Sequence, residues 1–498
     1  MILTYILGLP FLAAVGLLFV PRNFRVVMRG VAVLATGLSA VLALAMFVQF
    51  RAGATGYQFV QQVHWVSVLG ISYHVGVDGI NVGLILMGAI VAFAAACVSW
   101  EIKEREKEFY ILLLVMAGGI LGAFASLDLF LFYFFHELAL VPTFIMIGVW
   151  GRGLDKNYAT FQITLYLSLG ALIALVGLIA LYLQAGGNTF DIPELTRRLQ
   201  QNGLSGSAQG FIFPLLLLGF GILVSLWPFH TWAPLGYGSA PSATAMLHAG
   251  VLKKFGLYGL IRIALPMLPD AARDWMPILA WLCLGNLVFC GWVAMRQKDF
   301  NWLAGYSSVA HMGFVFLGIA TLNVIGVTGA VLVMIAHGFL AALTFGLNGH
   351  IYHQTGTLQM DQLGGLARRL PFIGTALVMA ALAGCGLPGF ANFAGEVTVL
   401  FGAWREFRVV TVLACWGALI IGAVYMLRAI RTILYGPLPE KWAQVADTPH
   451  LWRKTPFIVL LAALLAFGFW PRLLTDRIAP SVKEGVLAVV NRNLIAAP

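Results

Sequence analysis

The sequence predicts an all-α integral membrane protein of about 14 transmembrane helices, ten of which form two inverted five-helix repeats, each with a broken helix. Of its 498 residues, 60% are hydrophobic and only 10% are charged, whereas soluble domains carry about 25% charged residues. The apolar runs reach the length of about 20 residues that a helix needs to cross the hydrocarbon core. They are continuously apolar, which disfavours a spanning β-barrel, whose strands would alternate apolar and polar residues.

The apolar runs predict 14 spans in chain order. They lie near residues 1–20, 28–50, 77–99, 109–124, 127–149, 159–184, 209–232, 240–265, 275–295, 301–321, 325–351, 371–402, 409–435 and 455–473. We expect the first span to be a retained helix, because Arg22, Arg25 and Arg29 follow its apolar run, whereas a signal peptide carries its positive charges before that run.

The distribution of Lys and Arg predicts the orientation in the membrane. With the N-terminus outside, 17 of the 30 Lys and Arg residues fall in inner loops and 11 in outer loops, and Lys253 and Lys254 lie within a span. Inner loops of membrane proteins carry an excess of these residues. We therefore expect both termini on the outer side, and we assign the net charge of +10 to membrane orientation and not to binding of nucleic acid.

Two interrupted helices define the repeats. Span 7 is broken within the stretch WPFHTWAPLGYGSAP, and span 12 within GCGLPGFANFAGE. Each is the fourth span of a group of five, and paired broken helices in inverted repeats are typical of transport sites. The predicted organisation is helices 1–3 at residues 1–108, a first repeat at 109–266 with its broken helix at 209–236, a second repeat at 267–437 with its broken helix at 371–402, and helix 14 with the C-terminal tail at 438–498.

Glu137 is the ionisable residue that stands out most clearly. It lies nine residues beyond Asp128, and therefore about 13 Å into span 5 at about 1.5 Å per residue. An unpaired charge at the centre of a span costs about 3 kcal/mol or more. A protonated carboxyl used for packing is one interpretation, and a proton-carrying group is the interpretation that its depth favours. For its neighbour His136, structural and functional roles remain open.

Other ionisable residues lie in the spans of both repeats. Lys253 and Lys254 are adjacent, so at most one of them faces a given partner, and the residues alone leave open which one is functional. Glu396 follows the break in span 12, where it either binds freed backbone amides or is a terminal proton site. His311 and His337 are either interhelical hydrogen-bonding groups or part of a polar axis with Lys254 and Glu396.

His230 and His248 flank the uncharged break in span 7, and for both the structural and functional readings remain open. Lys, Glu and His side chains bridged by water can pass protons stepwise. The sequence has no nucleophile–base constellation, its five cysteines have no metal-site spacing, and no Gly-rich nucleotide loop follows a strand. A proton-translocating carrier without a redox cofactor of its own fits these observations, and a hydrolase does not.

Several stretches occur in the order and spacing of one known family. The sequence resembles the antiporter-like subunits of proton-pumping NADH:quinone oxidoreductase, respiratory complex I, and within them subunit M, from about residue 70 to 437. Subunit L usually adds a long lateral helix, which this sequence lacks. The stretches are HVGVDGIN, EFYILLL, FHELALVPTFIMIGVWG, WPFHTW, AGVLKKFGLYGLIR, NWLAGYSSVAHMGFVFLGI, AHGFLAALTFG and GLPGFANFAGE.

The resemblance implies roles for individual residues. Glu137 would be the essential glutamate of span 5, Lys254 the lysine that connects two half-channels, His311 and His337 part of the central axis, and Glu396 the exit-side acid. It also implies L-, N- and K-like partner subunits in an energy-coupling membrane, most simply the bacterial inner membrane. NADH, FMN, iron–sulfur clusters and quinone would bind to partner subunits.

The sequence departs from the family at three places. Leu223 occupies the position of a span-7 lysine, His136 replaces a tryptophan, and PLGYGSAP replaces a Pro-Asp-Ala-His run. Either His136, His230 or Lys253 takes over from the missing lysine, or this chain pumps weakly or not at all. Our hypothesis is that His136 or His230 pairs with Glu137. The alternatives are a subunit of a cation/proton antiporter or membrane-bound hydrogenase, and a membrane spacer that moves no protons.

Overall fold

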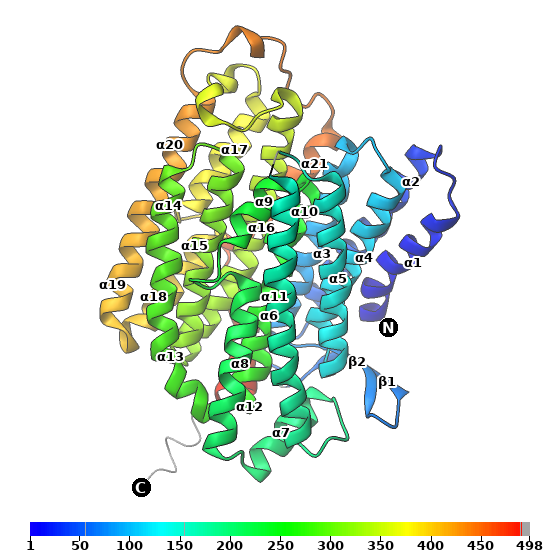
Figure 1. Ribbon diagram of the computed structural model, residues 1–498, viewed down its shortest axis with the longest axis vertical. Helices are drawn as coiled ribbons and strands as arrows, with labels where there is room; N and C mark the ends of the chain where they lie inside the picture. The colour runs from blue at the N-terminus through cyan, green and yellow to red at the C-terminus, as the bar shows by residue number, and fades with distance from the viewer. Residues whose placement is uncertain (55, 154, 489, 491–498) are drawn as a thin grey trace.

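The structure is a computed structural model that describes residues 1–54, 56–153, 155–488 and 490. Long helices run roughly parallel to one another along the long axis (Figure 1). The β-hairpin and α7 lie at one end, and the loops that precede α21 lie at the other. Eleven helices in the described part are long and apolar enough to cross a membrane. The end of the predicted tail, 491–498, lies outside the described residues.

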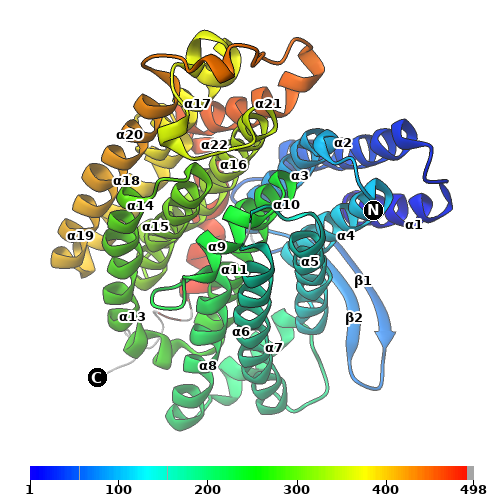
Figure 2. The ribbon, with the colours of Figure 1, turned by 45° about the horizontal axis from the view of Figure 1, so that its top comes forward.

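Helices occur at the spans predicted for the first part of the chain. The two N-terminal helices pack together at one edge of the molecule (Figure 2). The elements are α1 (Ile2–Phe19), α2 (Arg25–Gln49), β1 (Gln58–Val66), β2 (Ile71–Val77), α3 (Asn81–Val98), α4 (Glu106–Ala125), α5 (Leu129–Trp150), α6 (Lys156–Gln184), α7 (Ile192–Asn202), α8 (Gly206–Val224), α9 (Trp232–Ser239), α10 (Ser242–Leu247), α11 (Lys254–Gly259) and α12 (Leu265–Met267).

The rest of the chain likewise has helices at the predicted spans. They are α13 (Pro269–Leu284), α14 (Gly291–Arg296), α15 (Phe300–Ala320), α16 (Val324–Thr355), α17 (Pro371–Gly384), α18 (Ala391–Glu406), α19 (Arg408–Cys415), α20 (Gly422–Leu434), α21 (Leu451–Phe469) and α22 (Arg472–Ser481). Among these, α15 and α16 are almost wholly buried, and α16 packs against α15 and α18. The centre of the protein is therefore formed largely by these two helices, which carry His311 and His337.

Both predicted helix breaks are present. Seven residues separate α8 from α9, and six separate α17 from α18. The first break begins at Ser225, whose φ of 74° ends α8. Asn286 satisfies backbone groups that the break frees: its Nδ2 donates to the Ser225 carbonyl at 2.9 Å, and its Oδ1 accepts from the backbone N–H of Trp227 at 2.9 Å. The broken backbone is thus held by a buried amide from the second repeat.

Three predicted spans contain π-helical segments that the sequence analysis did not anticipate. Span 8 consists of α10, α11 and α12 joined by π segments at His248–Leu252 and Leu260–Ala264. Spans 9 and 13 contain the π segments Gly285–Cys290 and Trp416–Ile421. Such segments often occur at functional sites, because they rotate the following side chains relative to a regular helix. In span 8 the first of them ends directly before the two lysines.

A hairpin and two short helices also lie outside the predicted spans. Strands β1 and β2 pair antiparallel before α3, so the helix of span 3 begins at Asn81 and not at residue 77. Helix α7 is amphipathic, with Ile192, Leu195 and Leu199 buried. Helix α22 follows the last span.

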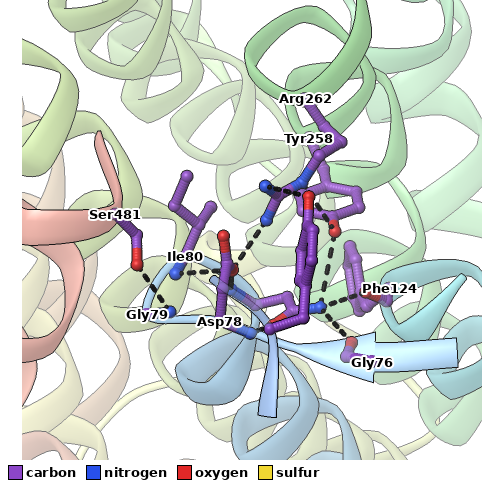
Figure 3. Close-up of polar contacts among 10 residues, drawn as sticks. Gly76, Asp78, Gly79, Ile80, Phe124, Tyr258, Arg262 and Ser481 are labelled. Carbon is purple, nitrogen blue, oxygen red and sulfur yellow. Dashed lines mark hydrogen bonds and ion pairs between the residues drawn. The ribbon is translucent and has the colours of Figure 1, made fainter. Parts of the chain in front are cut away.

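A buried polar cluster ties the hairpin end of the molecule together (Figure 3). Arg262 Nη2 lies 2.6 Å from Asp78 Oδ1, and only 5% and 7% of their side chains are exposed. Arg262 Nε donates to the Tyr258 hydroxyl at 3.2 Å. The backbone N–H of Gly79 donates to Ser481 Oγ at 2.9 Å. The start of α3, the end of span 8 and α22 are therefore linked through one charged pair and its neighbours.

Candidate proton pathway

Lys254 lies at the centre of the candidate site. It is the first residue of α11, and its side chain is fully buried. Its Nζ donates to the Ala249 carbonyl at 2.6 Å and lies 2.8 Å from Nδ1 of His337. The carbonyl belongs to the π segment that precedes α11, and His337 belongs to α16. The first repeat therefore meets the second through a direct lysine–histidine contact.

His311 continues this contact toward the second broken helix. Its ring centroid lies 5.6 Å from that of His337. Both rings line a small cavity with Ser307, Ser308 and Thr344. The cavity has room for about one water molecule. Because Nε2 of His311 is buried without a partner in the described protein, a water in this cavity would satisfy an otherwise unpaired group.

Glu396 lies beyond His311 on α18 and is 4% exposed. A second small cavity is lined by His311, Glu396 and Tyr425. It also has room for about one water, and Oε1 of Glu396 is buried without a partner in the described residues. The structure thus brings four predicted residues together. Their spatial order is Lys254, His337, His311 and Glu396.

Lys253 points to a different partner. Its fully buried Nζ donates to Ser308 Oγ at 3.0 Å and contacts the Ser308 carbonyl at 3.3 Å. It also lies 5.6 Å from the ring centroid of Tyr237. Since Ser308 lines the cavity beside His311, both lysines face the central axis, although they contact different helices of the second repeat.

His248 lies on the first-repeat side of the lysines. Its Nδ1 is 3.3 Å from the Tyr237 hydroxyl, and its ring meets that of Trp232 edge-on at 5.5 Å. The backbone N–H of Lys253 donates to the His248 carbonyl at 3.1 Å. His248 therefore packs against α9, beside the backbone turn that leads into the two lysines.

Glu137 does not point into the central cavities. About 34% of its side chain is exposed, on the face of α5 that also exposes Phe134 and Val141. His136 is buried, its Nδ1 lies 3.7 Å from Oε1 of Glu137, and its ring stacks on Phe255 at 3.9 Å. Of the two histidines proposed as partners of Glu137, His136 is adjacent to it.

His230 lies within the first helix break, and Leu223 lies in the last turn of α8 before it. Nδ1 of His230 is 3.2 Å from the Pro228 carbonyl, and its ring lies near Phe289 and Tyr306. Within the described part of the chain, His230 therefore contacts its own break and the second repeat, and not Glu137. Leu223 is 3% exposed and belongs to the hydrophobic core.

Several polar groups of the site were not predicted. Ser308 binds Lys253, Ser307 accepts from the Tyr425 hydroxyl at 3.0 Å, and Tyr237 contacts His248. Ser308 and Ser307 precede His311 by three and four residues, so they lie on the same face of α15 as His311. This spacing is the sequence feature from which the two serines could have been predicted as part of the site. In the described part of the chain no group of three His, Cys, Asp or Glu side chains is placed to bind a metal.

The fold and the row of buried titratable side chains define a class of membrane proteins, the antiporter-like transmembrane subunits. Comparison with known proteins shows that the chain belongs to this class. Residues 126–422 match the family described as NADH:quinone oxidoreductase/Mrp antiporter, transmembrane. The chain therefore belongs to this family, as its resemblance predicted.

Relatives and a solved structure agree with this assignment. The chain is 35% identical to NAD(P)H-quinone oxidoreductase chain 4 of Synechococcus elongatus, over 99% of this chain and 92% of that one. It is 34% identical to subunit M of the NADH-quinone oxidoreductase of Rhodobacter capsulatus, over 91% and 89%. A chain of respiratory complex I from Thermus thermophilus matches with a TM-score of 0.89 and 28% identity, over 98% and 100%. The M-type resemblance is confirmed.

Proposed function

We propose that this chain is a proton-translocating membrane-arm subunit of an NADH:quinone oxidoreductase. Quinone reduction takes place in other subunits of that enzyme, which bind NADH, FMN and the iron–sulfur clusters. This chain supplies a route for protons along buried Glu, Lys and His side chains and intervening water. The observation that carries the proposal is the 2.8 Å contact between Lys254 Nζ and His337 Nδ1, both buried, at the junction of the two repeats.

The proposed route has two halves. In the first repeat, a proton passes from Glu137 by way of His136 and His248 to the lysines. In the second repeat, it passes from His337 and His311 to Glu396 through the two small cavities. An excess proton can move along such a row when each group binds and releases it in turn and water bridges the gaps.

The repeat boundaries, orientation and partners form part of the same proposal. The repeats are residues 109–266 and 267–437, and both termini face the outer side of a bacterial inner membrane. L-, N- and K-like subunits adjoin the chain. A half-exposed carboxyl such as Glu137 is costly in contact with lipid, which supports a partner subunit against this face of α5.

His136 is the proposed replacement for the missing span-7 cation. Its Nδ1 is 3.7 Å from Oε1 of Glu137, whereas Leu223 supplies no charge. An imidazole and a carboxyl this close can pass a proton between them, directly or through a water. The pair therefore carries one exchangeable proton without a lysine on α8.

Replacing Lys254 by Met tests the function. Sealed inside-out membrane vesicles containing the whole enzyme are supplied with NADH, and proton uptake is measured together with NADH oxidation. We expect fewer protons translocated per NADH oxidised, because Met removes the titratable group but keeps much of the side-chain volume. A Thr36→Val variant is the control, since Thr36 is a buried residue of α2 that bonds only its own helix. Unchanged proton uptake in the Lys254 variant would refute the function.

Leu223 favours a second candidate function, a membrane spacer with weakened pumping. A buried leucine replaces the cation that the family uses, so this copy would keep the fold and lose part of the route. Replacing Glu137 by Gln separates the candidates, because a spacer would keep the same proton-to-NADH ratio. A role in a cation/proton antiporter is the other alternative, and genes for neighbouring subunits of such an antiporter would favour it.

A further inference from the structure

Two cavities open at the end of the molecule opposite the β-hairpin, which is the inner end in the proposed orientation. The first is lined by Glu101, Cys97 and His350 among others. The second is lined by Arg152 and Asp299 among others. Both lie beside the last turns of α16, since His350 lines the first and Tyr352 lines the second. Neither cavity belongs to the route described above.

Arg152 lines the second cavity. Its guanidinium is 4.4 Å from the ring centroid of Tyr352, and it feels the charges of Glu101 and Asp299. Burial lowers the pKa of Arg152, and these two carboxylates oppose that effect. Its Nε and Nη2 are buried without a partner in the described protein. Unpaired buried groups of a cation are sites for ordered water.

Glu101 adjoins the α16 helix at Gly349. A Cβ at Gly349 would lie 3.7 Å from Glu101 Oε2 and would collide with Ser242 Oγ. The absence of a side chain at Gly349 thus lets a carboxylate and a hydroxyl approach the backbone of α16. Glu101, which lines the first cavity, thus lies beside the turn of α16 that carries Asn348, the first of a row of polar side chains on this helix.

The row runs from Asn348 through Thr344 to His337. Spacings of four and seven residues place these three side chains on one face of α16, over about 16 Å at about 1.5 Å per residue. Asn348 Nδ2 donates to Asn301 Oδ1 at 2.9 Å. Asn348 Oδ1 and Asn301 Nδ2 are buried and have no hydrogen-bond partner among the described residues. Thr344 then lines the same small cavity as His337.

We infer that Glu101 and the row Asn348–Thr344 form a proton inlet from the inner-end cavity to His337. The inference rests on the proposed proton-translocating function. The inlet bypasses Glu137 and the broken helix α8–α9, and it delivers protons directly to the second repeat. Glu101 takes up the proton from the cavity, and water held by the spare amide groups of Asn348 and Asn301 passes it to Thr344 and the cavity beyond.

Two variants test the inlet in the intact enzyme in sealed inside-out vesicles. Glu101→Gln removes the proton-binding group, and Thr344→Val replaces the hydroxyl with a methyl group of similar size. Because a positioned acid or base speeds proton transfer by about 100-fold or more, we expect either variant to slow the proton step by about that factor. The measured result is a lower ratio of protons translocated to NADH oxidised. Thr36→Val is the control and should keep the ratio of the unmodified enzyme.

Lys254→Met separates failure of the inlet from failure of the function. A reduced ratio in the Lys254 variant, with normal ratios in both inlet variants, overturns the inlet and leaves the function standing. A normal ratio in the Lys254 variant overturns the function. If an inlet variant fails to assemble, shown by loss of the chain from the purified enzyme, the decision rests on the labelling measurement below.

Chemical labelling tests whether the inner-end cavity is wet without any substitution. Cys97 lines this cavity, whereas Cys283 is fully buried elsewhere. A membrane-impermeant methanethiosulfonate reagent is applied to inside-out or right-side-out vesicles, and labelled cysteines are identified by mass spectrometry. We expect Cys97 to be labelled only in inside-out vesicles and Cys283 in neither. Protection of Cys97 in inside-out vesicles, or labelling from the outer side, overturns the inlet.

Discussion

Removing the carboxylate of Asp78 should destabilise the protein strongly. Asp78 Oδ1 contacts Arg262 Nη2 at 2.6 Å and accepts from the backbone N–H groups of Ile80 and Asn81 at 3.0 and 3.2 Å. In an Asp78→Ala variant, the buried guanidinium loses its counter-charge. Breaking a buried pair by removing one partner costs about 3–5 kcal/mol. The two unpaired N–H groups place the expected loss toward the upper end of that range.

The assay is unfolding in mixed micelles titrated with a denaturing detergent, together with the amount of chain retained in the purified enzyme. An Arg22→Ala variant is the control, because the Arg22–Glu108 pair is largely exposed and exposed pairs contribute little. Adding Arg262→Met to Asp78→Ala should recover part of the loss, since it removes the unpaired charge. The reasoning is refuted if Asp78→Ala unfolds like the unmodified protein, or if the double variant is less stable than Asp78→Ala.

Three further predictions concern helix packing and the first-repeat route. A Cβ at Gly219 on α8 would lie 2.5 Å from the backbone N of Ala174 on α6, so Gly219→Ala should destabilise the protein by about 1–3 kcal/mol, measured by the same titration. Gly210→Ala on the same helix meets open space and should not destabilise it. His136→Phe should lower the proton-to-NADH ratio in vesicles; an unchanged ratio would exclude His136 as the partner of Glu137.

The sequence was sufficient for the helical framework because membrane helices are recognised by length and hydropathy alone. It predicted each span and both breaks, where Pro and Gly interrupt apolar runs. It did not predict the π segments around Lys254, because one extra residue in a helical turn changes neither hydropathy nor composition. The hairpin was also missed, because β1 reads QFVQQVHWV, with polar residues that do not alternate regularly with apolar ones.

The candidate site was predicted in part. Glu396, His311, His337 and Lys254 stand out because titratable groups are costly within a membrane, and the structure brings them together. The partner of each group depended on helix rotation, which the sequence does not specify. Thus the roles of the adjacent lysines were left open, and the structure shows that one meets His337 and the other Ser308.

The absence of the span-7 lysine changes how the first-repeat route must run. On the face of α8 near Leu223, Phe220 meets Phe132 of α5 and Phe255 of α11, and Phe132 stacks on Phe255 at 4.2 Å. This aromatic cluster leaves α5 and α11 in apolar contact where a charged side chain would need water. His136 stacks on a member of the same cluster, Phe255, at 3.9 Å. Glu137 therefore has a polar neighbour in His136, whereas the described face of α8 near Leu223 presents an aromatic side chain, and this packing supports the proposed route through His136.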